Sequence, residues 1–525
     1  AMPLSALCWN GGVAAVAVEP YSQSEAGTIR NGVFAALPDA FGVSLGYTND
    51  PVTFKNRSTA APSTRNMACK AQTSGTIYLR HGPRTELHEI IRQEYARHQD
   101  RAVPRNTLRQ AVQGMLDTFA YQNFDAAAGE YTNRCCRPPR ETEMRPWRLV
   151  TEIGWTGGGV LAYPLVLCRD ALGADAEAPL AAAMSGEQLF DRIADAYNEN
   201  SGLLNDLMAP NAAGSQVNGW WTGYGLVKDC HCAYTVDSAV HYLTKTMDYL
   251  HQNGKPCPAK WMDAAQKVLH TVMDLQRADG AFGYTYSTQE RKVLDWSGFA
   301  GCWFAPALVY LYRLTGEERC LHSAEKALDY YHTFVKDLNC YGTPMDTWKA
   351  VDEEGNLAFM RGSRLLYEQT GKAEFLQYMK DSAGYEFLWR YGYKTYPEHT
   401  PLNQGWSACG GAVTSVSNPH IHPMGVIIDT DLRYLARVTG DGYYASRAAD
   451  SAAWMLQCLE LYPAATGYGR YGILSERWCP SDGLDVERFS DGRPFSSWFS
   501  HNLWASACVL EAACELLLEI EHKKG

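Results

Sequence analysis

The feature that most constrains the fold is a repeated pair of helices in which the first helix ends at Thr-Gly. Each clear copy consists of an apolar helix, the Thr-Gly pair and a second, amphipathic helix. The three apolar helices and their ends are 307–314 with Thr315-Gly316, 363–369 with Thr370-Gly371, and 427–438 with Thr439-Gly440. Glycine ends a helix readily because it lacks the Cβ atom that disfavours the left-handed conformation. Weaker ends of the same kind are predicted at Gly173 and Gly254.

The number of these units predicts how the helices are arranged. They give six apolar helices, the last at 498–520, and a polar helix at 106–122 precedes the first. Successive helix ends are 55 to 81 residues apart, whereas common solenoid repeats have periods of up to about 50 residues. Six apolar helices accompanied by six more polar ones favour a closed ring, because a helix buried on all sides is apolar all round. We therefore predict a mainly α protein, an (α/α)6 toroid of six inner and six outer helices over residues 96–525.

The first 95 residues have a different composition. Gly, Ser, Thr, Asn and Pro separate short β-prone runs at 32–36, 42–47 and 75–80. We expect residues 1–95 to form a short β-rich segment that precedes the toroid.

Charge and composition exclude several classes of protein. The formal net charge is −11, 46% of residues are hydrophobic and no basic cluster is present, so a nucleic-acid partner is not expected. No apolar run reaches the roughly 18–20 residues of a membrane span, and no basic residue precedes the apolar run 12–18 as it would in a signal peptide. The 16 cysteines lie scattered in apolar stretches, which favours free thiols in a reducing compartment. We predict a cytoplasmic protein and leave open whether it is a homo-oligomer.

Long connections lead into the apolar helices, and short connections lead out of them. Because long loops often contain functional residues, we place the active site in a funnel where these loops meet the inner helices. The loops contain nine of the 15 Trp residues, and the face of a Trp ring stacks well on a sugar. Any single Trp could instead only cover the edge of the core. The candidates for sugar binding are Trp155, Trp220, Trp221, Trp296, Trp348 and Trp478.

The candidate catalytic carboxylates of these loops are Glu152, Asp237, Asp295, Asp346, Glu353 and Glu476. Hydrolysis of a glycosidic bond normally uses one carboxyl group as the acid and a second as the base or nucleophile. We assign these roles to Asp295 and Glu152, with Asp237 in reserve. Glu152 lies between two Trp residues, where partial burial would raise its pKa toward that of a general acid. Asp237 and Asp295 have a second interpretation, because Asp is also a favoured cap of free N–H groups at the start of a helix.

Other polar residues are candidates for contacts with the sugar. His420 and His422 stand two apart, so in an extended segment both side chains would point to the same side. His501 and Arg361 complete this set, and an arginine can bind a substrate carboxylate through two hydrogen bonds.

Cysteine and histidine also occur close together at Cys135-Cys136 and Cys230-His231-Cys232. Such residues could bind zinc, but this spacing matches no common closed zinc motif. We expect neither a metal nor a cofactor.

Residues 294–317 resemble a segment of the (α/α)6-toroid carbohydrate-active enzymes. The similarity is greatest to the unsaturated glucuronyl and rhamnogalacturonyl hydrolases and the related β-glucuronidases. It depends on Leu294-Asp295, the run Cys-Trp-Phe-Ala-Pro-Ala-Leu at 302–308, and Leu314-Thr315-Gly316-Glu317. The resemblance implies a glycoside hydrolase whose oligosaccharide substrate can contain a uronic acid. It also implies that Asp295 is an acid/base group at the start of an inner helix.

Other functions of the same toroid remain open. A polysaccharide lyase would need a Tyr or His base, for which Tyr234, His420, His422 and His501 are candidates. A sugar epimerase would use His422 and His231. A toroid that only binds glycans or a partner protein would tolerate the loss of any single carboxylate.

Overall fold

The computed structural model describes most of the chain, and every structural statement below concerns the described residues. These are 2–24, 27–37, 40–47, 53–54, 57–58, 76–98, 100–135, 145–147, 153–154, 158–206, 219–221, 226–343, 349–395, 406–417, 420–461, 472–476, 478, 500–501 and 503–523.

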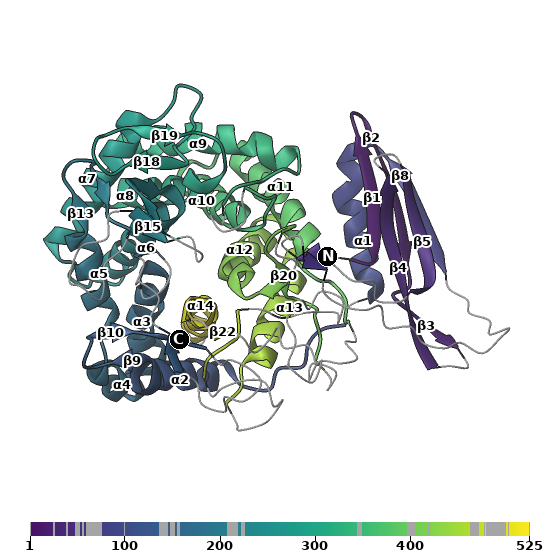
Figure 1. Cartoon of the computed structure of the whole chain (residues 1–525), viewed down its shortest axis with the longest axis horizontal. Helices are drawn as coiled ribbons and strands as arrows, with labels where there is room; N and C mark the ends of the chain where they lie inside the picture. Colours follow the sequence, from purple (N-terminus) through teal and green to yellow (C-terminus); the bar gives the residue numbers. More distant parts are fainter. Residues whose placement is uncertain are drawn as a thin grey trace.

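Six helices form a closed inner ring (Figure 1). They are α3 (Gly159–Leu172), α6 (Ala233–Gln252), α8 (Phe304–Thr315), α10 (Glu354–Thr370), α12 (Asp429–Thr439) and α14 (Leu503–His522). Each helix contacts the next in this order, and α14 contacts α3, which closes the ring. The 3-10 helix η7 (Met424–Ile428) leads directly into α12 and contacts both α10 and α14.

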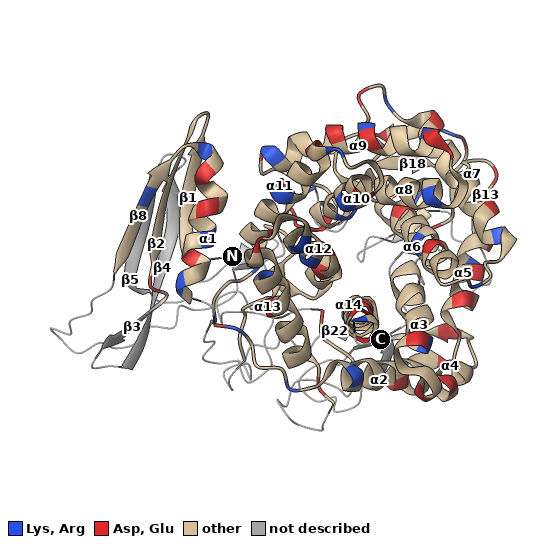
Figure 2. Cartoon of the chain, turned by 180° about the vertical axis from the view of Figure 1, so that it is seen from behind, with Lys and Arg blue, Asp and Glu red and all other residues tan. Residues whose placement is uncertain are grey.

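Six further helices surround this ring. They are α2 (Leu108–Thr118), α5 (Gly186–Asp195), α7 (Ala259–Leu275), α9 (Glu318–Lys336), α11 (Ala373–Trp389) and α13 (Gly442–Cys458). Each packs against inner helices; α9, for example, contacts both α8 and α10. Acidic and basic side chains are frequent on the outer helices (Figure 2). The predicted (α/α)6 toroid is therefore confirmed.

Short helical pieces occur in the connections of the ring. They are the π-helix η2 (Phe119–Asn123) and η3 (Gly173–Ala176), α4 (Glu177–Ala182) and η4 (Ala300–Trp303). The last of these leads into α8 and contacts α6 and α10.

The Thr-Gly pairs end the inner helices as the sequence predicts. Gly316, Gly371 and Gly440 follow α8, α10 and α12 in the left-handed conformation, with φ of 72°, 67° and 71°. The threonine contributes as well. The hydroxyl of Thr315 donates to the carbonyl of Leu311 at 2.8 Å and accepts from the N–H of Glu317 at 3.3 Å. The same two bonds recur at the other two pairs, so each hydroxyl satisfies a carbonyl and an N–H group at the turn.

Small antiparallel sheets occur in the long connections before the inner helices. The two-stranded sheets are β9 (Phe124–Asp125) with β10 (Glu130–Tyr131), β13 (Tyr197–Asn198) with β14 (Leu203–Leu204), β15 (Gly219–Trp221) with β16 (Leu226–Lys228), and β20 (Ala412–Val413) with β21 (Ile421–His422). The three-stranded sheets are β12 (Arg145–Trp147)-β11 (Asn133–Cys135)-β22 (Ser500–His501) and β17 (Cys230–Cys232)-β18 (Thr285–Ser287)-β19 (Val293–Asp295). The first of these joins the segment before α3 to the segment before α14.

Two three-stranded antiparallel sheets form the N-terminal part, which confirms the predicted β-rich segment (Figure 1). One consists of β1 (Leu4–Trp9), β2 (Gly12–Val18) and β8 (Ile77–Gly82), with β2 in the centre. The other consists of β3 (Tyr21–Ser24), β4 (Gly27–Leu37) and β5 (Ala40–Tyr47), and β6 (Thr53–Phe54) pairs with β7 (Arg57–Ser58). Contacts of β2 with β4 and β5 bring the two sheets together.

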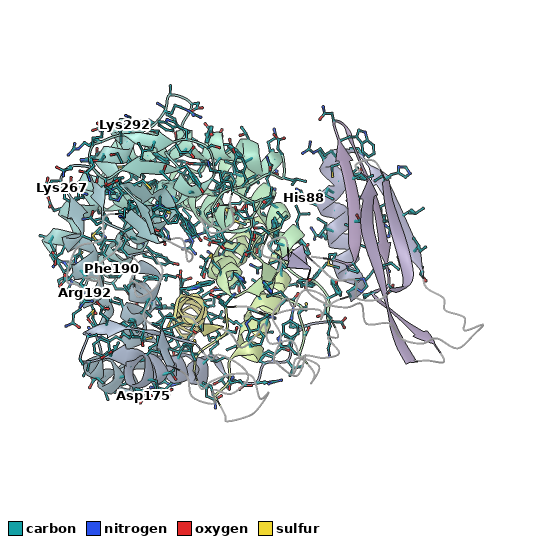
Figure 3. All side chains as sticks on the ribbon, in the orientation of Figure 1. His88, Asp175, Phe190, Arg192, Lys267 and Lys292 are labelled. Atoms are coloured by element: carbon teal, nitrogen blue, oxygen red, sulfur yellow. The ribbon has the colours of Figure 1, made fainter. Side chains whose placement is uncertain are left out.

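Helix α1 (Leu87–His98), which follows η1 (Arg84–Glu86), joins the N-terminal part to the ring. The hydroxyl of Tyr95 donates a hydrogen bond of 2.6 Å to Asp450 on α13. His88, labelled in Figure 3, lies over Gly384 on α11, where a Cβ atom would come within 2.4 Å of the imidazole. A side chain at position 384 would therefore require the imidazole of His88 to move.

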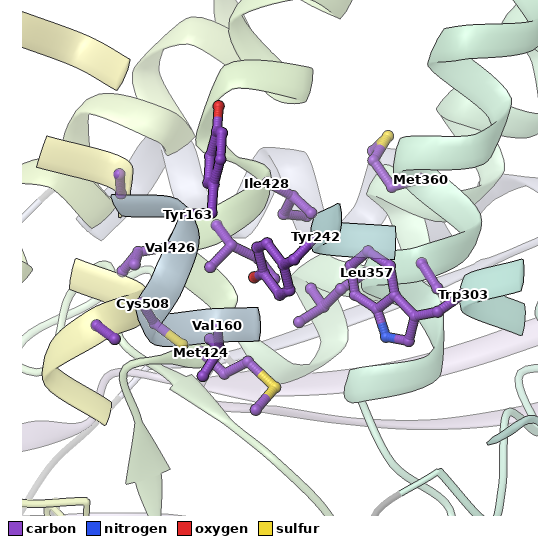
Figure 4. Packing of buried hydrophobic residues seen from close by; sticks show 14 of the residues in the cluster. Val160, Tyr163, Tyr242, Trp303, Leu357, Met360, Met424, Val426, Ile428 and Cys508 are labelled. Carbon is purple, nitrogen blue, oxygen red and sulfur yellow. The ribbon is translucent and has the colours of Figure 1, made fainter. Parts of the chain in front are cut away.

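Buried side chains of the inner helices and of η7 pack against one another in the core. Figure 4 shows Tyr163, Tyr242, Leu357, Met360 and Ile428 among them, each from a buried helix face. One charged cluster accompanies this core: Lys245 lies 2.5 Å from Glu511 and 2.8 Å from Glu515. Among the helices that the structure describes, none combines the length and apolar character needed to cross a membrane.

Candidate active site

The starts of the inner helices α6 and α10 and of the 3-10 helix η7 meet at one place. Tyr234 is the second residue of α6, Glu354 is the first residue of α10, and Met424 is the first residue of η7. The hydroxyl of Tyr234 donates a hydrogen bond to the carboxylate of Glu354 and lies 3.6 Å from the sulfur of Met424. Burial and the neighbouring Glu354 raise the pKa of Tyr234 well above its ordinary value, so this phenol stays protonated. These contacts lie where the long connections enter the inner helices, at the end of the ring predicted for the funnel.

Asp237 lies on α6 one turn beyond Tyr234, on the same face of the helix. Its side chain is completely buried, and Oδ2 accepts a hydrogen bond of 3.1 Å from the backbone N–H of Trp303. Burial raises the pKa of Asp237 well above its ordinary value, although two backbone N–H groups act in the opposite direction. Burial therefore favours the neutral form of Asp237, which can donate a proton.

A group of buried carboxyl side chains lies next to Glu354 in the sequence and in the fold. The carboxyl group of the preceding residue, Glu353, is buried beside Glu386, and burial together with Glu386 raises the pKa of Glu353 well above its ordinary value. Arg390 joins this group to α12, with bonds of 3.0 Å to Glu386 and 2.7 Å to Asp429. Burial raises the pKa of Asp429 to about 6 against the opposite effect of Arg390. The starts of α10 and α12 are thus surrounded by carboxyl groups whose proton affinity is raised.

The two predicted histidines lie beside the same helix starts. His420 and His422 are 1% and 7% exposed, and His422 is part of β21. The ring of His422 is 5.9 Å, centroid to centroid, from the ring of Trp504 near the start of α14. The described structure thus places both histidines close to the end of the ring where Tyr234 lies.

The position predicted for Asp295 is wrong. Asp295 is the last residue of β19, whereas the inner helix α8 begins only at Phe304. Residues 293–295 form a strand because they pair with β18, so the inner helix does not begin at Asp295. Oδ2 lies 2.6 Å from Nζ of Lys349, and Oδ1 accepts from the N–H of Ser297 at 2.8 Å. Partial burial raises the pKa of Asp295, but Lys349 and the N–H groups outweigh it and hold the pKa below its ordinary value. The catalytic role of Asp295 stays a prediction, and in this arrangement the carboxyl group is ionised.

Each of the described Trp candidates packs against protein groups. Trp220 is buried and its indole N–H donates to Sγ of Cys230 at 3.3 Å. Trp478 is buried and stacks on Trp406, with ring centroids 6.2 Å apart. Trp296 is half-buried, with the Arg277 guanidinium 5.2 Å from its ring centroid. Their contacts are those of packed side chains, and their sugar-binding roles stay predictions.

Arg361 is completely surrounded by protein groups. Its Nε lies 2.8 Å from Asp431, Nη2 donates to the carbonyl of Ile427 at 2.7 Å, and the residue is 1% exposed. Arg364 also pairs with Asp431, at 2.5 Å. Contact of Arg361 with a substrate carboxylate would require this buried ion pair to break.

Several predicted residues lie outside the described part of the chain. Glu152, Trp155 and Trp348 belong to segments that are not described, and for Trp221 and His501 only the backbone is described, on β15 and β22.

His231 has protein partners on both ring nitrogens. Nδ1 is 2.8 Å from Asp206, and Nε2 is 2.9 Å from the hydroxyl of Ser201. Asp206 also accepts from the N–H of Cys232 at 3.0 Å, directly before α6 begins. No group of three or more residues suited to a metal ion occurs among the described residues.

Glu354 is the residue that sequence reasoning missed. It is the third of three successive carboxylates, and only its position as first residue of α10 distinguishes it from Asp352 and Glu353. The sequence feature that could have identified Glu354 is the row of apolar residues on the same face of the helix, which begins three residues later at Leu357.

The comparisons with known proteins identify the fold. No protein-family model and no curated protein sequence matches the chain. A family 76 glycoside hydrolase from a bovine Bacteroides thetaiotaomicron strain matches over 86% of this chain and 83% of its own, with 12% identity and a TM-score of 0.50. A cellobiose 2-epimerase from Spirochaeta thermophila DSM 6192 matches over 84% of this chain and 99% of its own, with 13% identity and a TM-score of 0.50. A sugar epimerase from a ruminal bacterium matches over 78% and 98%, with 11% identity and a TM-score of 0.50. The chain shares the (α/α)6 toroid with these structures.

Proposed function

We propose that the protein is a carbohydrate-active enzyme, and that it is a glycoside hydrolase acting on oligosaccharides. The observation that supports this most is the contact of Tyr234 with Glu354, with Asp237 one turn further along α6. A neutral, buried carboxyl group and a second carboxylate that accepts a hydrogen bond are the two groups that glycoside hydrolysis needs.

In this proposal the two carboxyl groups have different roles. Asp237 is the general acid that protonates the leaving oxygen, because burial keeps it neutral. Glu354 is the base or nucleophile, and the hydroxyl of Tyr234 orients its carboxylate. Asp295 fits the acid role less well, because its ion pair with Lys349 favours the ionised form.

The charge of the substrate also belongs to this proposal. In the described part of the site Arg361, Arg390 and Lys349 are each paired with a carboxylate. The carboxylate of a uronic acid substrate would thus need a cationic partner from another part of the chain. We therefore favour a neutral sugar next to Glu354.

A sugar epimerase is the second candidate function. Epimerisation needs groups that remove and return a proton. The buried His420 and His422 supply imidazoles, and His422 lies beside Trp504 at the start of α14. Two of the structures with the same fold are a sugar epimerase and a cellobiose 2-epimerase. The polysaccharide lyase is less favoured, because the raised pKa of Tyr234 opposes its use as a base.

An assay of product class separates these functions. The purified protein and its Asp237→Asn variant are incubated with neutral, saturated-uronide and 4,5-unsaturated oligosaccharides and with free disaccharides. New reducing ends that the variant no longer releases would support the hydrolase. Epimerised disaccharide without new reducing ends would contradict the hydrolase and support the epimerase. A rise in the ultraviolet absorbance of an unsaturated uronate would support the lyase instead.

A further inference from the structure

Among the described residues, three polar side chains of α6 and η4 have buried atoms without a hydrogen-bond partner. They are Asp237, through Oδ1, His241, through both ring nitrogens, and Trp303, through Nε1. The three residues are 0%, 1% and 3% exposed. Buried polar groups are nearly always hydrogen-bonded in folded proteins, so such atoms indicate a partner that is not a protein group.

The three side chains belong to one cluster. His241 follows Asp237 by four residues on α6, so the two side chains lie on the same face of that helix. The imidazole of His241 lies 4.5 Å, centroid to centroid, from the indole of Trp303, whose backbone N–H is already bonded to Asp237. Figure 4 shows Tyr242, Leu357 and Trp303 close together among the buried side chains of the core.

The donors and acceptors of this cluster complement each other. Burial, together with Arg361 on α10 and Lys245 on α6, lowers the pKa of His241 well below its ordinary value, so its neutral ring has one donor and one acceptor nitrogen. The indole is a donor only. Since Oδ2 of Asp237 accepts from a backbone N–H, the acidic proton belongs on Oδ1.

We propose that Asp237, His241 and Trp303 bind one internal water molecule, and that His241 is a positioning residue which acts on Asp237 through this water. The water accepts from the indole N–H and from the carboxyl O–H, and donates to the bare nitrogen of the imidazole. Two to four polar partners are typical of a buried water molecule.

Such a water would serve both protonation states of Asp237. While Asp237 is protonated, the water accepts the hydrogen bond of Oδ1. When the leaving glycosidic oxygen takes this proton from Oδ1, the water turns and donates to the carboxylate that remains. A fixed cation would stabilise only the ionised form and would lower the proton affinity that a general acid needs. The catalytic part of this inference rests on the proposed function of Asp237, but the water site itself does not.

The water site is tested without reference to activity. A high-resolution crystal structure of the full chain is expected to show one ordered water within about 3.2 Å of Asp237 Oδ1, a His241 nitrogen and Trp303 Nε1. The Trp303→Phe variant keeps an aromatic ring but loses the donor, so the water should be displaced or disordered there. Direct bonds among the three side chains with no water between them would overturn the proposal.

The positioning role is tested by kinetics. His241→Phe keeps the aromatic packing, and His241→Gln keeps one donor and one acceptor near the water. We expect His241→Phe and Trp303→Phe to lower kcat at least about tenfold with KM within about twofold, and His241→Gln to recover part of the loss. The matched control is His332→Phe, because His332 also stacks on an aromatic ring, that of Tyr378, but bonds Asp381 on the outer helices.

The outcomes separate the two proposals. An unchanged kcat in both His241→Phe and Trp303→Phe would overturn the positioning role while the hydrolase stands. Absence of hydrolysis by the wild-type protein would overturn the hydrolase and the positioning role together, and the crystal structure alone would then decide the water site.

Discussion

The hydroxyl of Tyr234 on α6 donates a hydrogen bond to the carboxylate of Glu354 on α10. These helices are two places apart in the inner ring, since α8 lies between them. The bond therefore depends on the closed ring and not on local sequence. It brings a protonated phenol and a carboxylate together where the proposed sugar site lies.

Removal of this hydroxyl should reduce activity without unfolding the protein. A hydrogen bond to a charged group contributes about 1.5–3 kcal/mol, so Tyr234→Phe should lower kcat about 10- to 100-fold. The control is Tyr378→Phe, which removes a phenol bonded at 2.8 Å to Asp329 on the outer helices. Equal kcat values for the two variants would contradict a catalytic position for Tyr234.

Asp352 should make stability depend on pH. Burial raises its pKa to about 7, against N–H groups of Thr343 and Gly355 that bond the carboxylate. Between about pH 4 and pH 7 the unfolded chain loses this proton while the folded chain keeps it, so the free energy of unfolding falls as pH rises. The fall is about 1.4 kcal/mol per pH unit, about 4 kcal/mol in total, and it stops above about pH 7.

Denaturant titrations between pH 4 and pH 8 measure this effect. Asp352→Asn should remove the contribution of Asp352 to the slope of the free energy of unfolding against pH. The variant also loses one hydrogen-bond acceptor, so its free energy of unfolding should be lower than that of the wild type at low pH. Asp263→Asn, on the exposed face of α7, should keep the wild-type slope. A wild-type slope in Asp352→Asn would show that Asp352 is ionised in the folded protein.

The left-handed helix end should make Gly371 difficult to replace. Nothing lies within 4 Å of a Cβ atom built at Gly371, so the cost of Gly371→Ala is conformational. We expect a loss of about 1–2 kcal/mol in the free energy of unfolding. Gly442→Ala adds the same methyl group in equally open space without a positive φ and should not destabilise the protein. Equal effects in the two variants would refute this reason for the Thr-Gly pattern.

The buried pair of Arg361 and Asp431 should support the fold and not the chemistry. Removing one member leaves an uncompensated buried charge, so Asp431→Asn should lower the free energy of unfolding by about 3–5 kcal/mol. The folded fraction should keep the wild-type kcat and KM. Asp274→Asn, which breaks an exposed pair with Arg319, should cost under about 1 kcal/mol. A raised KM for acidic sugars in Arg361→Met would instead support the predicted contact with the substrate.

The ring could be predicted from the sequence because its signals are local. An apolar run followed by Thr-Gly specifies a helix and its end within one turn, as Thr370 and Gly371 illustrate. The number of such units then limits the architecture to very few possibilities.

The site could be predicted only in part, because it depends on contacts remote in sequence. Asp295 is on a strand because β19 pairs with β18, which in turn pairs with β17 some sixty residues earlier. Of the carboxylates at 352–354, Glu354 is the one bonded to Tyr234, and it is also the one with which α10 begins. The sequence does not specify to one residue where α10 begins.

The most direct measurement of an active site at the inner-helix starts is the kcat of Glu354→Gln beside that of Asp295→Asn, on an oligosaccharide that the wild-type protein hydrolyses. We predict that Glu354→Gln loses at least about 100-fold in kcat while Asp295→Asn stays within about twofold of the wild type. A large loss in Asp295→Asn with an active Glu354→Gln would contradict this site and return catalysis to the sheet that contains β19.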